Sequence, residues 1–577
     1  MKLQKLIYTL IPIVCFGCLE TAQAVVPAPD SCYPGFTTAE GCKALQSLTT
    51  GAGNTAVGWY SLFLNTTGSF NTAVGAGALV LNTADNNTAT GAAALLLNTT
   101  GSNNTANGVD ALVFNSTGGS NTATGALALF SNTTGSGNTA TGNQALFSNV
   151  SGSGNTASGY QALHSNTTGL TNTAFGDQAL FSNIAGGGNS AVGWNALSSN
   201  LADDNTAIGN HALGSNTTGE ENTASGAFAL SSNTEGDFNT ANGFNALASN
   251  ITGQRNTATG DSALNSNTTG SRNTATGNAA LVVNTVGSDN TAVGTGALQA
   301  NNGDTNTAIG AGALAANTTS DSNTAIGTNA LAANTTGHDN LASGQGALAA
   351  NIGGNFNVAI GNNALGSNMT GSDNIALGDG AGFSITTATN MICIGTNVPA
   401  NDSNSCYIGQ IFGTTVPGGA TVFINSIGKL GTSTSSRRFK EEINPMEQAS
   451  ELLFALKPVT FRYKKELDPR GMPQFGLVAE DVEKVNPDLV VRDKEGKPYS
   501  VRYDQVNAML LNEFLKEHRN GEEQDRKILK QEAAIAKQQK QIDGLEQELK
   551  EQRALIEKVN ARFETNNAAP RLVVDKL

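Results

Sequence analysis

Charged residues are scarce in this sequence: they make up 14% of its 577 residues, and the net charge is −14. The few basic residues are also unevenly placed, since 26 of the 32 lysines and arginines follow Ser436. No basic patch is available for phosphate groups, which argues against nucleic acid as a partner. The charge distribution divides the chain into a nearly uncharged body, at about residues 37–385, and a charged segment of conventional composition from about residue 431.

Long apolar runs are almost absent as well. The exception is Leu6–Leu19, which follows Lys2 and Lys5 and precedes Ala22-Gln23-Ala24. This layout is typical of a secretory signal peptide cleaved after Ala24, so residues 1–24 predict an exported protein, located in the periplasm, outside the cell or on the cell surface of a bacterium. Lipoprotein processing at Cys18 is the alternative. No other stretch reaches the roughly 18 apolar residues of a membrane span, so none is predicted after signal removal.

Cysteine and histidine are rare. Removal of the signal peptide leaves four cysteines, which form two local pairs at the ends of the uncharged body: Cys32, Cys42, Cys393 and Cys406. An even count in an exported protein favours disulfides, with buried free thiols as the alternative. The four histidines are scattered, at His164, His211, His338 and His518. Because none of these residues has the spacing of metal ligands, we predict neither a metal site nor a cofactor.

What the sequence does contain is one phrase repeated about twenty times, N-T-A-x-G-x-x-A-L-x-x-N-T-T-G-S-x. Units open at Asn54, Asn71 and Asn87 and continue to Asn374, with a step of 17 residues almost everywhere and 16 at three points. Because the period is short and fixed, we expect every unit to adopt the same conformation and to stack on its neighbour. The repeat therefore predicts a rod.

Within a unit such as Asn121–Gly137, the apolar residues are few and small and lie between Gly125 and the turn Asn132–Gly135. Such short segments between turn signals are too short for helices and favour strands. We therefore predict a mostly β fold in which each unit forms one coil of a β-solenoid (parallel β-roll). Ala and Leu would line a dry interior, Asn at unit positions 1 and 12 would stack in ladders, and Gly at position 5 would allow a turn where a Cβ would collide.

The 17-residue solenoid repeats are predicted for residues 54–385. Residues 25–53 would form an amino-terminal cap with a degenerate first repeat, and residues 386–430 the terminal coils and a linker. The stretches Asn374–Gly378, Ile392–Gly395 and Cys406–Gly409 resemble the heads of YadA-type trimeric autotransporter adhesins, which are parallel β-rolls of N-x-A-x-G-like units with a shorter period. This resemblance implies a trimeric, adhesin-like rod.

The charged segment opens with Thr434-Ser435-Ser436-Arg437-Arg438-Phe439-Lys440, and further blocks follow at residues 452–463, 474–482 and 486–490. Their order resembles the endosialidase-type intramolecular chaperone, a self-cleaving module that ends many phage tail spikes. The resemblance covers about residues 431–565. It implies a small α+β chaperone and autopeptidase domain at residues 431–510.

In that family a serine and a lysine five residues later form a dyad, which here falls on Ser435 and Lys440. A hydroxyl is a poor nucleophile near neutral pH, and a partly desolvated lysine can act as its base. Attack by Ser435 on the Thr434 carbonyl closes a five-membered ring, so scission is expected between these two residues. Ser436 stands where the family usually has Asp or Asn, which bears on cleavage more than on fold. The alternative is a Ser-rich linker followed by solvated basic residues. No activity on other molecules is predicted.

Beyond Tyr503 the sequence predicts a long helix. Apolar residues recur on one seven-residue lattice, at Phe514, Ile528, Ile535, Ile542, Leu549, Ile556 and Phe563. This seam predicts a coiled coil at residues 511–565, followed by a tail at 566–577. The heptads fit two strands or three, and the two resemblances imply a homotrimer.

Three functions fit this organisation. The first is an exported trimeric fibre or adhesin, with a cell-surface or glycan ligand, whose end module aligns the chains because identical repeats can slip by one unit. The second is a phage-derived, tail-spike-like protein that binds or degrades glycans. Glycan hydrolysis would require paired carboxylates about a cleft. Acidic residues such as Asp203, Asp204, Glu220 and Glu221 lie in the variable turn between coils, and no insertion breaks the period there to build a pocket. The third treats the threonine rows as an ice-binding or surface-binding face.

Overall fold

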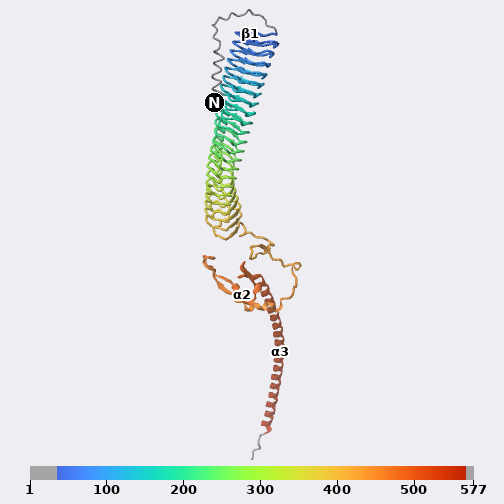
Figure 1. Ribbon diagram of the computed structural model, residues 1–577. Helices are drawn as coiled ribbons and strands as arrows, with labels where there is room; N and C mark the ends of the chain where they lie inside the picture. The colour runs from blue at the N-terminus through green and yellow to red at the C-terminus, as the bar shows by residue number, and fades with distance from the viewer. Residues whose placement is uncertain (1–34, 567–577) are drawn as a thin grey trace, which may run out of the picture. The chain divides into compact units, whose positions relative to one another are not determined.

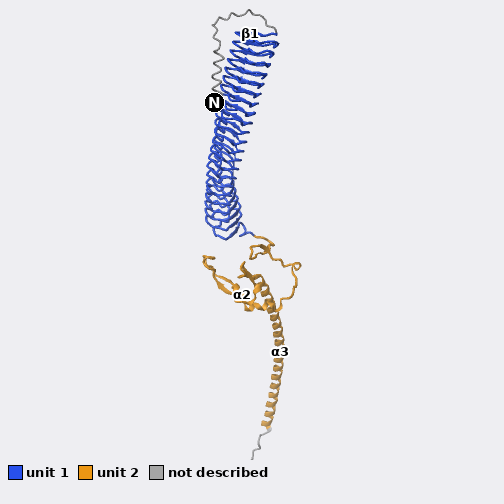
Figure 2. Cartoon of the chain, in the orientation of Figure 1, with its two compact units in different colours: residues 1–414 blue, residues 415–577 orange. Residues whose placement is uncertain are grey.

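The structure is a computed structural model that describes residues 35–566. The predicted signal peptide and Cys32 therefore lie outside the described residues. The chain divides into two compact units, residues 1–414 and residues 415–577 (Figure 2). Within the described range, no helix combines the length and the apolar character needed to cross a membrane.

The first unit is a β-solenoid whose coils stack along one axis (Figure 1). Each coil contributes one three-residue strand to a sheet of 23 strands, and neighbouring strands pair in parallel, threonine beside threonine in most coils. The strands are β1 (Thr38–Glu40), β2 (Thr55–Val57), β3 (Thr72–Val74), β4 (Thr88–Thr90), β5 (Thr105–Asn107), β6 (Thr122–Thr124), β7 (Thr139–Thr141), β8 (Thr156–Ser158), β9 (Thr173–Phe175), β10 (Ser190–Val192), β11 (Thr206–Ile208), β12 (Thr223–Ser225), β13 (Thr240–Asn242), β14 (Thr257–Thr259), β15 (Thr274–Thr276), β16 (Thr291–Val293), β17 (Thr307–Ile309), β18 (Thr324–Ile326), β19 (Leu341–Ser343), β20 (Val358–Ile360), β21 (Ile375–Leu377), β22 (Ile392–Ile394) and β23 (Cys406–Ile408).

The core of the solenoid is narrow and lined by three side chains per coil. The middle residue of each strand points inward, as Ala123 does in β6, while Thr122 and Thr124 point outward. Ala128 and Leu129, which follow in the same coil, are also fully buried. The same positions are buried from Ala56 to Leu365 and form one continuous apolar cluster. The predicted dry interior of Ala and Leu is confirmed.

The buried leucine adopts a left-handed backbone conformation in every coil, with φ of 52° at Leu129. A β-branched side chain is strongly disfavoured at positive φ. This constraint explains why unit position 9 is Leu, and never Ile or Val, from Leu62 to Leu365.

Both predicted asparagine ladders are present. The asparagines at unit positions 1 and 12 are buried, and each is bonded along the rod and within its own coil. For example, Nδ2 of Asn132 donates to Oδ1 of Asn115 at 2.7 Å and to the carbonyl oxygen of Gly135 at 2.9 Å. The ladders therefore satisfy backbone groups at corners that no strand pairing reaches.

The three 16-residue coils differ from the others at one corner. Each has a turn shortened by one residue, and each carries an aspartate there: Asp85, Asp203 and Asp304. In all three, Oδ1 accepts a hydrogen bond at 2.7 Å from a backbone N–H of the preceding coil. The ladder bond is 3.4 Å between Asn82 and Asn65 and 3.2 Å between Asn301 and Asn284, and at the third short coil Oδ1 of Asn183 has no hydrogen-bond partner. Asp237 and Asp321 make the same bond in 17-residue coils, so it is the shortened turn that breaks the repeat symmetry.

The second unit is small and mostly exposed. It contains three antiparallel strand pairs, two α-helices and three 3-10 helices: β24 (Val422–Ile424) with β25 (Leu430–Thr432), η1 (Arg437–Phe439), η2 (Glu447–Ala455), β26 (Val459–Phe461) with β27 (Gln474–Gly476), α2 (Ala479–Val485), η3 (Pro487–Leu489), β28 (Val490–Arg492) with β29 (Pro498–Val501), and α3 (Tyr503–Asn566). Its buried apolar cluster has five members: Val482, Leu489, Val490, Val501 and Met509.

Helix α3 is a single helix of 64 residues. It begins at Tyr503, where the long helix was predicted to begin, and so inside the segment predicted for the chaperone domain. Its first turns pack on η2, where the Glu513 carboxylate accepts hydrogen bonds from Lys516 and Ser450, which lower the pKa of that carboxyl. The long helix is confirmed, and its pairing with other helices stays a prediction.

Candidate functional site

The predicted dyad residues lie next to each other. The short helix η1 turns the chain between them, with the N–H of Phe439 donating to the carbonyl oxygen of Ser436 at 3.0 Å and that of Lys440 donating to Arg437 at 3.1 Å. This turn brings Nζ of Lys440 to 3.1 Å from Oγ of Ser435, to which it donates a hydrogen bond. A nucleophile and its base need this separation.

Both side chains of the dyad are exposed to water in the single chain, as is every residue from 410 to 449. A lysine acts as a base only as the neutral amine, and burial is the usual means of favouring that form. The isolated subunit therefore supplies the contact between Ser435 and Lys440 but not the dry surroundings that general-base chemistry requires.

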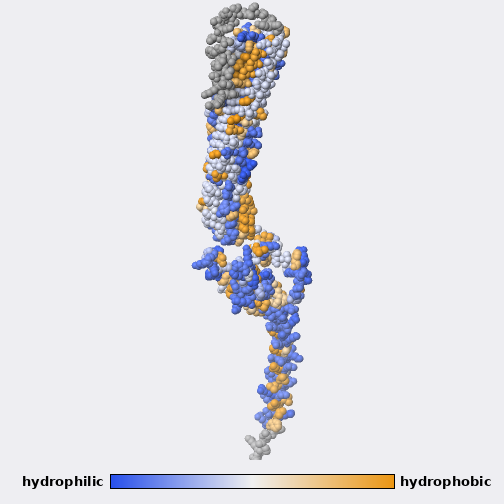
Figure 3. All heavy atoms as spheres, viewed as in Figure 1, coloured by the Kyte–Doolittle hydropathy of each residue, from blue (hydrophilic) through white to orange (hydrophobic). Residues whose placement is uncertain are grey.

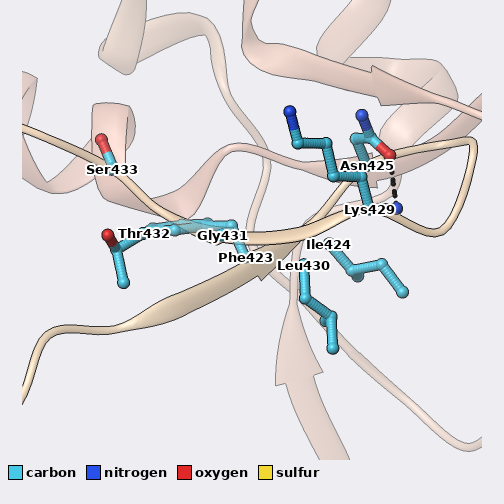
Figure 4. A pocket seen from close by; sticks show the side chains of 8 residues that line it. All are labelled: Phe423, Ile424, Asn425, Lys429, Leu430, Gly431, Thr432 and Ser433. Atoms are coloured by element: carbon cyan, nitrogen blue, oxygen red, sulfur yellow. Dashed lines mark hydrogen bonds between the residues drawn. The ribbon is translucent and has the colours of Figure 1, made fainter.

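The segment before the dyad forms a hairpin with a shallow apolar hollow of about 240 Å³ (Figure 4). Oδ1 of Asn425 closes the hairpin by accepting a hydrogen bond from the backbone N–H of Lys429 at 2.9 Å. Phe423, Ile424 and Leu430 line the hollow, which ends at Ser433, two residues before the nucleophile. No carboxylate lines it, so the hollow is unsuited to glycan hydrolysis.

A second hollow, of about 610 Å³, lies between η2, the strand pair β26–β27 and the start of α3. Its lining is mostly apolar and includes Leu456, Val459, Val506 and Leu510, with Glu513 as its one carboxylate. Phe454 and Phe475 at its rim are 75% and 83% exposed. Apolar surface of this size on a small unit is typical of a contact site for another chain.

The cysteines are free thiols, which differs from the predicted disulfide at the carboxyl-terminal end of the solenoid. In the pairing of β22 with β23, Cys393 lies opposite Tyr407, and Cys406 lies opposite Ile392. Because the two cysteines are one position out of register, they point to opposite faces of the sheet. Cys393 is buried and Cys406 exposed. Cys42 is also free, and its predicted partner Cys32 lies outside the described residues.

The acidic residues named for the glycan-hydrolysis alternative lie on turns at the edges of the coils. Oδ1 of Asp203 accepts a hydrogen bond from the backbone N–H of Gly187 and so stabilises a shortened turn. Asp204, Glu220 and Glu221 are exposed on coil edges. Among residues 35–566, no group of three or more His, Cys, Asp or Glu side chains could hold a metal ion.

An apolar sheet face was missed by the sequence reasoning. Over β16–β18 the second outward strand position is Val or Ile, and from β19 on the first outward position is no longer threonine and most outward residues are large and apolar. Figure 3 shows hydrophobic residues gathered at this end of the solenoid. We define the apolar sheet face by its exposed members: Val293, Ile309, Ile326, Ile360, Ile375, Leu377, Ile392, Ile394 and Ile408. The signal was present in the sequence, because unit positions 2 and 4 flank the inward alanine and must point outward.

Comparison with known proteins identifies one segment. Residues 435–491 match the family model described as chaperone of endosialidase. The match begins at Ser435 and ends before α3, so it covers part of the segment 431–565 in which the resemblance was seen. No curated protein and no solved structure matches the chain. A β-solenoid followed by this chaperone segment is the organisation of a tail-spike-like protein.

Proposed function

We propose that this chain is the subunit of an exported, adhesin-like trimeric fibre, and that its carboxyl-terminal unit is the intramolecular chaperone that aligns three copies. The exposed apolar surface of both units carries the proposal. Export rests on the signal-peptide layout of residues 1–24. The chaperone role is supported by the family match at residues 435–491.

The apolar sheet face supports contact between copies of the solenoid. Parallel sheets are normally covered on both faces, and here one face is covered by the chain's own core while the other presents Ile, Val and Leu to water. Three of its members, Ile375, Leu377 and Ile408, are 44%, 46% and 42% exposed. A second and third copy of the same face would cover these residues.

Helix α3 gives independent support. Its heptad residues are exposed along the whole length, for instance Ile535 at 61% and Phe563 at 68%. A long polar helix with an apolar stripe gains most of its stability from packing that stripe against other helices. Association of three α3 helices would provide that packing.

The register argument explains why a solenoid would need such a device. Nearly identical coils can pair one unit out of step with little loss of contacts, because only the short coils with Asp85, Asp203 and Asp304 mark the position along the rod. A trimeric end module that forms first would place the last coils of three chains level. Coil stacking would then proceed from a defined start.

Self-cleavage between Thr434 and Ser435 is part of the proposal. It is supported by the contact of Ser435 with Lys440 and by the start of the family match at residue 435. Packing of three copies around this exposed segment would remove water from Lys440 and favour its neutral form. Cleavage would thus follow assembly.

The other two functions receive less support. Asp203 is used by the coil corner, and the described carboxylates offer no catalytic pair on a cleft. For an ice-binding face, two matched threonine rows would have to run along the sheet, but the second outward position holds Thr, Asn, Ser, Phe, Val or Ile in β4–β11.

The test is the mass of the assembled protein by sedimentation equilibrium, with chains starting at residue 25 and carrying Ser435→Ala so that they remain whole. We expect three times the chain mass. Ile535→Asp with Ile542→Asp should abolish the trimer, because both residues lie on the apolar stripe. Lys537→Asp with Lys540→Asp, on the same helix away from the stripe, is the matched control and should leave the mass unchanged. A mass of one or two chains for the parent would overturn the proposal.

Refolding tests the chaperone role separately. The chain ending at residue 430 should refold from denaturant into irregular or aggregated material, whereas the whole chain should give uniform rods in electron micrographs. Identical rods from the shortened chain would refute a chaperone function while leaving trimer formation to be judged by mass.

A further inference from the structure

Four consecutive coils in the middle of the solenoid each place one aromatic ring at the same corner, directly after the strand. These rings, the aromatic strip, belong to Trp194, His211, Phe228 and Phe244. Successive ring centroids are 4.5 Å, 5.5 Å and 6.3 Å apart. The strip therefore runs along the rod axis over about three coil spacings, roughly 14 Å at about 4.8 Å per coil.

The coils do not need these rings in order to fold. The same two unit positions hold Ala126 and Leu127 in one coil and Thr295 and Gly296 in another, with the same strand pairing and the same buried core. Trp194, Phe228 and Phe244 nevertheless remain 48%, 40% and 52% exposed. Large aromatic side chains that contribute nothing to the core and stay in water are typical of binding surfaces.

The ring planes leave two aromatic faces open. His211 and Phe228 are stacked with 13° between their planes, so each covers a face of the other. Trp194 is turned by 79° relative to His211, and Phe244 by 85° relative to Phe228. Trp194 and Phe244 each have one ring neighbour in the strip, so at least one face of the indole and one face of the Phe244 ring are not covered by another ring of the strip.

Polar side chains flank the open faces at the same unit position. Asp177 is on the coil before Trp194, Asn210 is on the coil after it, and Asp261 is on the coil after Phe244. All three are exposed, and Asp261 also accepts a hydrogen bond from Asn278 at 2.9 Å. No lysine or arginine occupies the strip's two unit positions between Asp177 and Asp261.

We propose that the aromatic strip binds a neutral oligosaccharide lying along the rod. The C–H groups on the face of a sugar ring fit the electron-rich faces of Trp194 and Phe244, and planar carboxylate and amide groups suit the hydroxyls at the sugar's edge. The two carboxylates, with no cation beside them, repel an acidic glycan. The proposal rests on the adhesin role given above and assigns its ligand class.

A second copy of the chain is the other occupant to consider, because Val192 and Ile208 on the strands beside the strip are exposed as well. The charges argue against it. The strip ends in exposed carboxylates at both sides, which a contact between identical copies would bring close together or bury.

The test uses the fluorescence of Trp194. The chain has two tryptophans, so the variant Trp59→Phe leaves Trp194 as the sole indole. This full-length protein is titrated with neutral hexasaccharides of glucose, mannose and N-acetylglucosamine, and with a heparin hexasaccharide as the acidic probe. We expect a saturable change of Trp194 emission with at least one neutral hexasaccharide and none with heparin.

Variants then locate the site by calorimetry with the hexasaccharide that binds. Trp194→Ala and Phe244→Ala should each weaken binding on the order of tenfold, Trp194→Phe should retain most of it, and Trp59→Ala, at the same unit position in another coil, should not change it. Circular dichroism confirms that each variant is folded.

No response to any neutral probe, an equal response to heparin, or binding untouched by Trp194→Ala would overturn the proposal. So would a fall in sedimentation mass of Trp194→Ala, which would make the strip a contact between copies. Because the mass of the parent protein reports trimer formation without any sugar, failure of the saccharide site and failure of the fibre proposal are distinguishable.

Discussion

Oδ1 of Asn121 accepts two hydrogen bonds from Asn138 on the next coil, from its backbone N–H at 3.0 Å and from its side-chain Nδ2 at 3.1 Å. Both residues are fully buried. One carboxamide oxygen thus satisfies a backbone donor that no strand pairing reaches, and the arrangement recurs along the rod.

Asn121→Ala should therefore destabilise the solenoid more than an ordinary surface change. It leaves the backbone N–H of Asn138 buried without an acceptor, which costs on the order of 2 kcal/mol. The measurement is the urea midpoint followed by circular dichroism, together with hydrogen exchange at Asn138. Asn143→Ala, an exposed asparagine one coil away, is the control and should shift the midpoint little. Equal shifts of the urea midpoint in Asn121→Ala and Asn143→Ala would show that the asparagine ladder does not stabilise the corners of the coils.

Gly125→Ala should be among the most damaging single changes in the rod. Gly125 has φ of +132°, and an added Cβ would lie 2.6 Å from the carbonyl oxygen of Gly142 on the next coil. Backbone strain and overlap together cost on the order of 3 kcal/mol. Gly137→Asn is the matched control, since φ there is +67° and the nearest atom lies 3.9 Å away. The measurement is the thermal unfolding midpoint of each variant. An unchanged midpoint for Gly125→Ala would contradict the close approach of neighbouring coils at this glycine.

Ser435→Ala should stop self-cleavage. Mass spectrometry of the assembled parent is expected to show a fragment that begins at Ser435, and the variant should remain whole because no hydroxyl can attack the Thr434 carbonyl. Ser436→Ala should still cleave, because the Ser436 side chain makes no capping bond. Ser436→Asp, which restores the residue type usual in the family, should cleave faster. Only whole chains in the assembled parent would refute cleavage without affecting the chaperone proposal.

The thiols should differ in their reaction with iodoacetamide. Burial raises the pKa of Cys393 to about 11, so its reactive thiolate is about one thousandth of the total near pH 8 and labelling should accelerate with rising pH. Cys42 and Cys406 are exposed and should label at once, without a reducing agent. Peptide mapping distinguishes the sites. If Cys406 labels only after reduction, the bridge predicted from the sequence forms in the protein and the register of β22 and β23 must shift.

Much of the solenoid could be predicted because every unit carries the same residue types at the same positions. The period of 17, the inward alanine and leucine, the Gly turn and the two asparagine ladders all follow from residue types at fixed spacing. The role of Asp203 could not be predicted, because a carboxylate on a variable turn fits a catalytic group as well as a corner bond. The disulfide between Cys393 and Cys406 was predicted from the even number of cysteines and from their closeness in the sequence. Neither observation gives the register of the two strands, which places the two side chains on opposite faces of the sheet.

The dyad shows the same division. The order of the sequence blocks resembles the chaperone family, and this resemblance implies the dyad of Ser435 and Lys440. The family match at residues 435–491 confirms the resemblance. The distance of 3.1 Å between Nζ of Lys440 and Oγ of Ser435 depends on the short helix η1. A Ser-rich stretch followed by basic residues does not by itself predict such a turn. The long helix beyond Tyr503 was expected from the sequence and begins at that residue, but a heptad pattern does not fix how many helices associate.

By itself, the sequence determined the repeat, because a period of 17 residues with small side chains at fixed places permits few structures other than stacked coils. Only the tertiary structure decided which outward residues stay in contact with water. Burial depends on where neighbouring coils place their corners, so the exposed line from Trp194 to Phe244 and the apolar sheet face became visible only once the coils were stacked.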